Sequence, residues 1–76
     1  MKYKLVHISW FDAISTDDWM MADDIEEALP EIQTVGYLIR ETETLFIVAQ
    51  NVDFKNDSIS MTMTIPKVWC VKMREI

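Results

Sequence analysis

Residues 58–65 have the sequence SISMTMTI, in which hydroxyl and large apolar side chains alternate without a break. Because successive side chains of a β-strand point to opposite faces, this alternation predicts a strand with one apolar and one polar face. We expect the apolar face to lie in the protein interior, and it consists of Ile59, Met61, Met63 and Ile65. The hydroxyl face consists of Ser58, Ser60, Thr62 and Thr64.

The other predicted strands lie on both sides of this segment. Residues 2–10 alternate so that Val6, Ile8 and Trp10 share one face, which is the better core candidate. Gly36 is the only glycine and lies within residues 32–41, the first of the three segments described next. A glycine at this position indicates a bend, a bulge or the close approach of another backbone. Branched and aromatic residues favour strands in three more segments, which are residues 32–41, 44–52 and 68–76.

Residues 11–31 interrupt the alternation and predict a long loop with one short helix over residues 22–29. Pro30 is expected to end that helix. The whole chain, residues 1–76, is therefore predicted to be a single mainly β domain, a five-stranded SH3-like small barrel with the short helix in the loop after its first strand. The segment Ile65-Pro66-Lys67 stands where such a barrel has a helical turn before its last strand.

The chain carries a net charge of −6, and its acidic residues are concentrated. Residues 12–31 contain eight acids and no Lys or Arg. This balance argues against binding to duplex DNA or to an anionic membrane, where basic residues must neutralise phosphates. A chain of 76 residues with one cysteine has a small core and no internal disulfide, which favours self-association as a homo-oligomer.

No arrangement of residues predicts an enzyme or a cofactor site. His7 and Cys70 are the only histidine and cysteine, and they lie on the first and last predicted strands, where they could be neighbours. A small core cysteine and a half-buried histidine explain them more simply than a nucleophile and its base. The acidic run lacks the glycine and the spacing of a calcium-binding loop, so a solvated surface is expected.

Several short motifs together resemble a family of short uncharacterised tailed-phage proteins. The motifs are Trp10-Phe11-Asp12-Ala13, Ser15-Thr16-Asp17-Asp18-Trp19, Thr34-Val35-Gly36-Tyr37-Leu38-Ile39 and Ile65-Pro66-Lys67. The resemblance implies an SH3-like barrel and expression in the cytoplasm of an infected host bacterium, and it carries no assigned chemistry. Small phage proteins of this size are often similar to counter-defence factors, which is an analogy of context rather than of residues.

One hypothesis is that the protein sequesters a small nucleotide immune signal at a subunit interface. Tyr37 and Trp19 would stack on bases, because aromatic rings bind bases of any sequence. Polar and charged side chains would bind phosphate oxygens. These are Arg40, Thr62, Thr64 and Lys67.

The alternative hypothesis is an acidic inhibitor that docks on a basic surface of a host protein. Trp19 fits either a buried core position or a contact platform, because tryptophan is common in both. In the second case the carboxylates around it would speed association with a basic partner. The carboxylates expected to make contact are those of Asp17, Asp18, Asp23 and Asp24.

Overall fold

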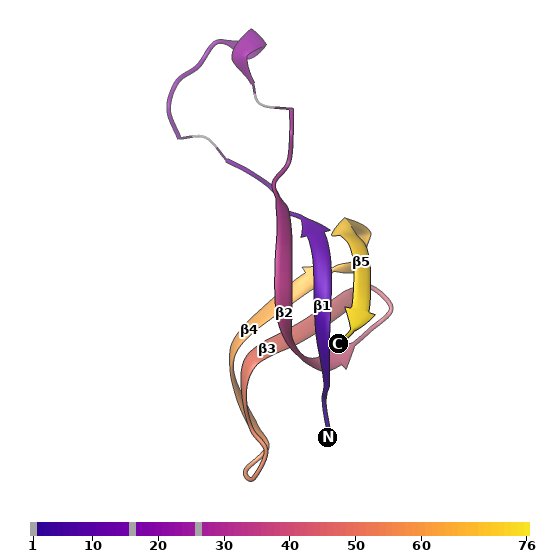
Figure 1. The fold of residues 1–76 in the computed structure, drawn as a ribbon. Coiled ribbons are helices and arrows are strands. Elements are labelled where there is room, and N and C mark those ends of the chain that lie inside the picture. The colour runs from indigo at the N-terminus through magenta and orange to yellow at the C-terminus, as the bar shows by residue number, and fades with distance from the viewer. Residues whose placement is uncertain (1, 16, 26) are drawn as a thin grey trace.

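The computed structural model describes residues 2–15, 17–25 and 27–76, and it is mainly β as the sequence predicts. Five antiparallel strands form one sheet in the order β4-β3-β2-β1-β5 (Figure 1). The strands are β1 (Lys4–Phe11), β2 (Glu31–Glu41), β3 (Leu45–Asp53), β4 (Ser58–Pro66) and β5 (Cys70–Glu75). Two short 3-10 turns are η1 (Ala22–Asp24) and η2 (Lys67–Trp69).

The sheet is open, so the prediction of a closed barrel is wrong. β3 and β4 cross behind β2 and β1 at a steep angle, and β5 lies on the other side of β1 (Figure 1). Closure would require β4 and β5 to pair, but within the described chain they are the two edges of the sheet. The turn η2 directs the chain from β4 back to β1, and the backbone N–H of Lys67 donates to the carbonyl of Thr44 over 2.8 Å. The predicted helical turn before the last strand is therefore confirmed.

The core lies on one face of the sheet, where the face of β1 predicted to be internal meets β3. Trp10 is buried, and its indole N–H donates to the Thr34 hydroxyl over 2.9 Å. This bond satisfies the polar atom that burial of an indole would otherwise leave unpaired. The buried apolar cluster consists of Val6, Ile8, Trp10, Phe46, Val48 and Ile65.

Gly36 is buried where β2 passes close to β3, as its position within a strand predicts. A Cβ atom built on Gly36 would lie 2.9 Å from the carbonyl oxygen of Ala49 and 3.6 Å from the Cβ of Val48. Real Cβ atoms do not approach a backbone oxygen so closely, so only glycine permits this contact. The contact brings the backbones of β2 and β3 close together at this point.

The apolar face of β4 differs from its prediction. Ile65 is fully buried against Phe46, but Ile59, Met61 and Met63 are 39%, 70% and 43% exposed. Met61 has a φ of 57°, and the otherwise continuous pairing of β3 with β4 lacks the pair between Gln50 and Met61. Of the apolar residues of β4, Ile65 at the end next to η2 is the one that joins the buried core. The expectation of a fully internal face is therefore wrong for three of its four residues.

Residues 12–30, which we call the acidic arm, project from the end of the sheet where β1 stops and β2 begins (Figure 1). The predicted helix over residues 22–29 is reduced to the single turn η1, and Glu26 of that prediction lies outside the described residues. So short a helix forms only when its apolar side is packed, and Ile25 and Leu29 are exposed. Met21 before the turn also provides no side-chain cap.

Candidate interaction surfaces

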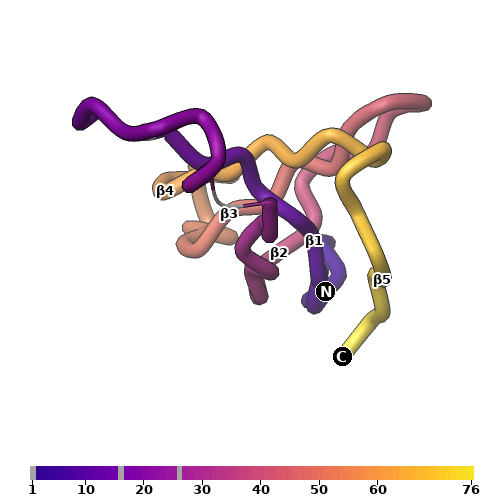
Figure 2. Tube along the Cα trace, turned by 90° about the horizontal axis from the view of Figure 1, so that it is seen from above, coloured from indigo at the N-terminus to yellow at the C-terminus, as the bar shows by residue number. Residues whose placement is uncertain are grey.

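The acidic arm is joined at its base and has extended backbone on both sides of η1. The backbone N–H of Asp12 donates to the carbonyl of Pro30 over 3.1 Å, directly beyond the last β1–β2 pair, Phe11 with Glu31. The residues on both sides of η1, Met21 and Ile25, have extended backbone angles. Seen from above, the arm leaves the sheet on one side while β5 lies on the other (Figure 2). The arm is thus a long surface loop with fixed ends.

The large apolar side chains of the arm are exposed. Trp19 is 101% exposed, so its indole contacts no other part of the chain and takes no part in the core. A group of exposed apolar side chains on one surface often marks an interaction site. Five neighbours in the arm are exposed as well, namely Ile14, Met20, Met21, Ile25 and Leu29.

The described acidic residues of the arm make no ion pair with the rest of the described chain. The four predicted contact carboxylates are all exposed, and they belong to Asp17, Asp18, Asp23 and Asp24. The ion pairs found in the described part of the chain all lie on the sheet and its turns, none of them on the arm. The structure therefore brings the predicted protein-interaction residues together on one projecting segment.

An apolar cleft of about 470 Å³ opens at the base of the arm. Phe11 and Ile14 line it from the arm side, and Trp69 with Val71 lines it from η2 and β5. Leu29 closes it from the returning end of the arm. Sequence reasoning missed this cleft, because its walls come from segments about 40 or more residues apart in the sequence, which the β1–β5 pairing brings together.

The six residues predicted to bind a nucleotide fall into three places. Tyr37 and Thr62 lie in one cross-strand row through Ala49, and Arg40 and Thr64 lie in another row through Ile47. Because cross-strand partners share a face, these four side chains belong to one side of the sheet. They are accompanied there by the opposed residues Ala49 and Ile47.

The other two predicted nucleotide ligands lie elsewhere. The Lys67 ammonium donates to a Glu41 carboxylate oxygen over 2.7 Å and stands 4.9 Å from the centre of the Phe46 ring, so its charge is already engaged. Trp19 lies on the arm, at the far end of β2 from Arg40. The chain by itself therefore does not combine the predicted stacking and phosphate-binding groups into one pocket.

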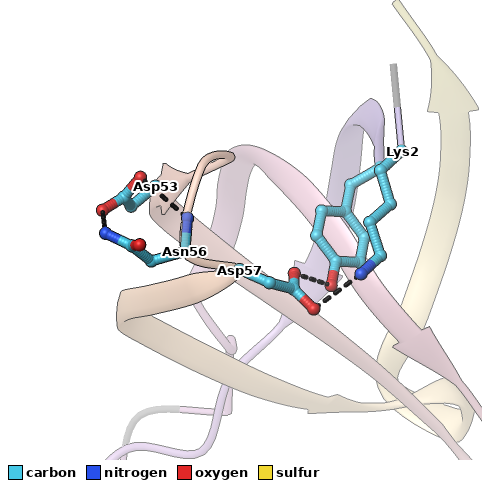
Figure 3. A network of polar contacts seen from close by, with 5 residues as sticks. Lys2, Asp53, Asn56 and Asp57 are labelled. Carbon is cyan, nitrogen blue, oxygen red and sulfur yellow. Dashed lines mark hydrogen bonds and ion pairs between the residues drawn. The ribbon is translucent and has the colours of Figure 1, made fainter.

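The turn between β3 and β4 is fastened by a polar network that sequence reasoning missed (Figure 3). The Lys2 ammonium and the Tyr3 hydroxyl donate to the two oxygens of Asp57, over 2.6 and 2.7 Å. The hydrogen bond from Lys2, followed by that from Tyr3, lowers the pKa of the Asp57 carboxyl, and the bond to Asp57 raises the pKa of Lys2. Asp57 itself has a φ of 54°, in the left-handed region that aspartate tolerates better than most residues.

Two further contacts hold the same turn. The carboxylate of Asp53 accepts from the side-chain amide of Asn56 over 2.9 Å and from the backbone N–H of Lys55 over 3.0 Å. These bonds, the Asn56 side chain first, lower the pKa of Asp53. The Phe54 ring packs edge-on against Tyr37, with ring centres 5.5 Å apart. The cluster of turn residues DFKND predicted this turn but not its attachment to the start of the chain.

The structure does not bring His7 and Cys70 together. β1 and β5 are neighbours, but His7 is opposite Arg74 whereas Cys70 is opposite Trp10. His7 and Trp10 are three positions apart on β1, so their side chains point to opposite faces. Among the described residues, no three acidic, histidine or cysteine side chains are grouped as metal ligands, and no helix is long and apolar enough to cross a membrane.

Comparison of the chain with protein families, with curated proteins and with solved structures finds no match.

Proposed function

We propose that this protein is a binding module that docks its acidic arm on a basic surface of another protein and thereby blocks that surface. The observation that carries the proposal is the full exposure of Trp19 among carboxylates that make no internal ion pair in the described chain. A basic partner with an apolar recess would bury the Trp19 ring in the recess and form ion pairs with the carboxylates of the arm. The extended arm can adapt to such a surface because it has no packing of its own to lose.

Magnitudes favour Trp19 as the anchor of this contact. Tryptophan is the residue most enriched among those that dominate binding energy, and truncating such an anchor costs about 2–4 kcal/mol. The carboxylates of Asp17 and Asp18 flank it in the sequence, and they would act mainly on the association rate, which falls as salt screens them. Ordering the arm opposes binding, so a single large apolar anchor is needed to leave a net affinity.

The test begins with capture of a partner from a bacterial lysate and continues with that partner in purified form. Its dissociation constant is measured for the unchanged protein, for Trp19→Ala, and for Asp17→Asn with Asp18→Asn. We expect Trp19→Ala to weaken binding at least about 30-fold, which corresponds to 2 kcal/mol. The double neutralisation should lower the association rate and flatten its dependence on salt.

Phe54→Ala is the matched control, because Phe54 is an exposed aromatic residue on the β3–β4 turn, away from the arm. It should leave the dissociation constant unchanged. Equal affinity of the unchanged protein and Trp19→Ala for the purified partner contradicts the proposal, as does a loss caused by Phe54→Ala alone.

A second candidate function is sequestration of a small nucleotide, favoured by the shared face of Tyr37, Arg40, Thr62 and Thr64. A guanidinium, two hydroxyls and a phenol ring suit a phosphate and a base. Calorimetry against cyclic and linear di- and trinucleotides tests this candidate, with Arg40→Ala expected to weaken any binding. Absence of heat across the panel removes it.

The setting that we propose is the cytoplasm of an infected bacterium, where a phage counter-defence factor would meet its target. The resemblance of the sequence motifs to tailed-phage proteins supports this setting. The proposed fold family is an SH3-like barrel left open, whose strand order is that of the meander of β1 to β4 with β5 returning to β1.

A further inference from the structure

The two edges of the sheet differ in their protection against pairing with another strand. β5 has the sequence CVKMRE, with three charged residues among six. β4 has the sequence SISMTMTIP, nine residues without a charge. Soluble proteins protect the free edges of their sheets with charged residues, short strands or covering segments. A long uncharged edge strand is a template for pairing with a strand of another chain. β4 hydrogen-bonds to β3 on one side only, so its other side is open in the described chain.

The apolar face of this edge is also uncovered. Ile59 and Met63 lie opposite Val52 and Val48 of β3, on the side of the sheet that carries the core. They are nevertheless exposed, together with Met61. A strand with an open edge and an apolar face continuous with the core has the properties of an interface cut in half.

The size of the isolated chain agrees with a missing partner. A compact monomer of 8.9 kDa exposes about 4,800 Å², whereas this chain exposes 6023 Å². Its radius of gyration is 15.7 Å, against about 11 Å for a compact domain of this length. The excess of about 1,200 Å² exceeds the roughly 800 Å² that each partner contributes to a stable interface. Both the arm and the β4 face contribute to this excess.

We infer that β4 pairs with β4 of a second copy, in antiparallel orientation about a twofold axis, so that two sheets become one of ten strands. A second copy fits because an uncharged strand meets no like charge when it pairs with itself, whereas the arms, each with seven acids, repel each other. Apolar residues lie opposite apolar residues only when one residue of β4 faces its own copy. Full overlap of Ser58–Pro66 places Thr62 at the axis.

The first experiment measures molar mass by light scattering at micromolar concentration. We expect the unchanged protein to have twice the mass of the chain. Met61→Lys should give the mass of a single chain, because it places a charge on the apolar face of the paired edge. The matched control is Val71→Lys, an exposed position on the charged edge strand β5, which should leave the dimer intact. An unchanged protein of single-chain mass overturns the inference, as does a dimer that Met61→Lys leaves intact or that Val71→Lys dissociates.

A second measurement remains decisive should Met61→Lys fail to fold. Thr62→Cys in a Cys70→Ser background places one thiol at the proposed axis, where opposed Cβ atoms lie within reach of a disulfide. Mild oxidation should convert most of this protein to covalent dimer, whereas Val71→Cys in the same background should form the same non-covalent dimer without a cross-link. Equal cross-linking of the two variants overturns the inference. Should Trp19→Ala instead abolish the dimer, the arm rather than β4 forms the interface between copies.

Discussion

The β3–β4 turn and the acidic arm are both exposed loops with carboxylates and an aromatic ring, yet they use these groups in opposite ways. In the turn, Asp57 binds Lys2 and Tyr3, and Phe54 packs on Tyr37. In the arm, Trp19 touches nothing, and no described carboxylate is ion-paired. The same residue types therefore stabilise one loop and are left unused by the other.

This difference separates residues that the fold needs from residues that it does not. The chain holds the four-residue turn with Lys2 and Tyr3, the residues just before β1, and with the Tyr37 ring. The chain therefore has groups able to hold an exposed loop, and it uses them on the turn. Trp19 takes no part in the core, and the described acids of the arm make no ion pair. We therefore infer that these residues bind another molecule. Equivalent substitutions should then lower stability in the β3–β4 turn but leave it nearly unchanged in the arm.

The largest effect on stability is expected in the sheet that carries both loops. Gly36→Ala places a methyl group 2.9 Å from the carbonyl oxygen of Ala49. Gly36 and Ala49 are both buried, and the backbone at Ala49 cannot easily move away from this methyl group. Overpacking of this kind costs about 1–3 kcal/mol. Chemical denaturation should show a lower midpoint with an unchanged slope. A variant as stable as the unchanged protein would show that β2 and β3 are not in close contact at this point.

The next effect distinguishes the two loops directly. Phe54→Ala removes the edge-on contact with Tyr37 and should lower the free energy of unfolding by about 1 kcal/mol. Trp19→Ala removes a larger ring and should change stability by less than about 0.5 kcal/mol, because exposed positions without contacts contribute little. Thermal unfolding of both variants at concentrations where they have the same oligomeric state checks this pair. A larger loss for Trp19→Ala would contradict the comparison.

Removal of the arm should leave the sheet folded. Replacing residues 13–29 with a short Gly-Asn turn keeps the strands β1 and β2 in register and shortens the loop that folding must close. The gain from loop shortening is about 1 kcal/mol. Circular dichroism should keep its β signal and the unfolding midpoint should stay or rise. Loss of cooperative unfolding would show that the arm contributes to the core.

The smallest effect concerns the turn at acid pH. Hydrogen bonds lower the pKa of Asp57 and of Asp53 in the folded protein, so their contribution to stability is present above the ordinary carboxyl value of 3.8 and is lost as pH falls through the lowered pKa. NMR shifts of the Tyr3 ring should change in that range together with those of Asp57. Asp57→Asn should remove this change. If the NMR shifts of the Tyr3 ring change with pH in the variant as they do in the unchanged protein, the network is refuted.

The sequence alone predicts most of the sheet, but it does not predict which parts of the sheet are covered by other residues. Alternation locates every strand, identifies Val6, Ile8 and Trp10 as core, and Gly36 signals the close approach of β3. Alternation is a local property, however, and the face of β4 has the same pattern whether a neighbour covers it or not. Met61 and Met63 were therefore predicted to be buried and are exposed.

The arm shows the same limitation of local signals. Helix propensity over residues 22–29 is real, but a helix of this length depends on packing that the arm does not receive, and only η1 forms. The acidic run and Trp19 were recognisable in the sequence as candidate contacts. Their complete exposure was not, because it depends on where the whole segment lies relative to the sheet.

The environment of Trp19 in the free protein tests the central claim most directly. With 5-fluorotryptophan at all three tryptophans, fluorine NMR resolves one signal for each ring, assigned by single Trp→Phe substitutions. We predict that the Trp19 signal shows the full solvent-isotope shift and strong broadening by a soluble paramagnetic agent, while the buried Trp10 signal shows neither. A Trp19 signal as protected as that of Trp10 would mean that the arm folds onto the chain itself, and would contradict the account.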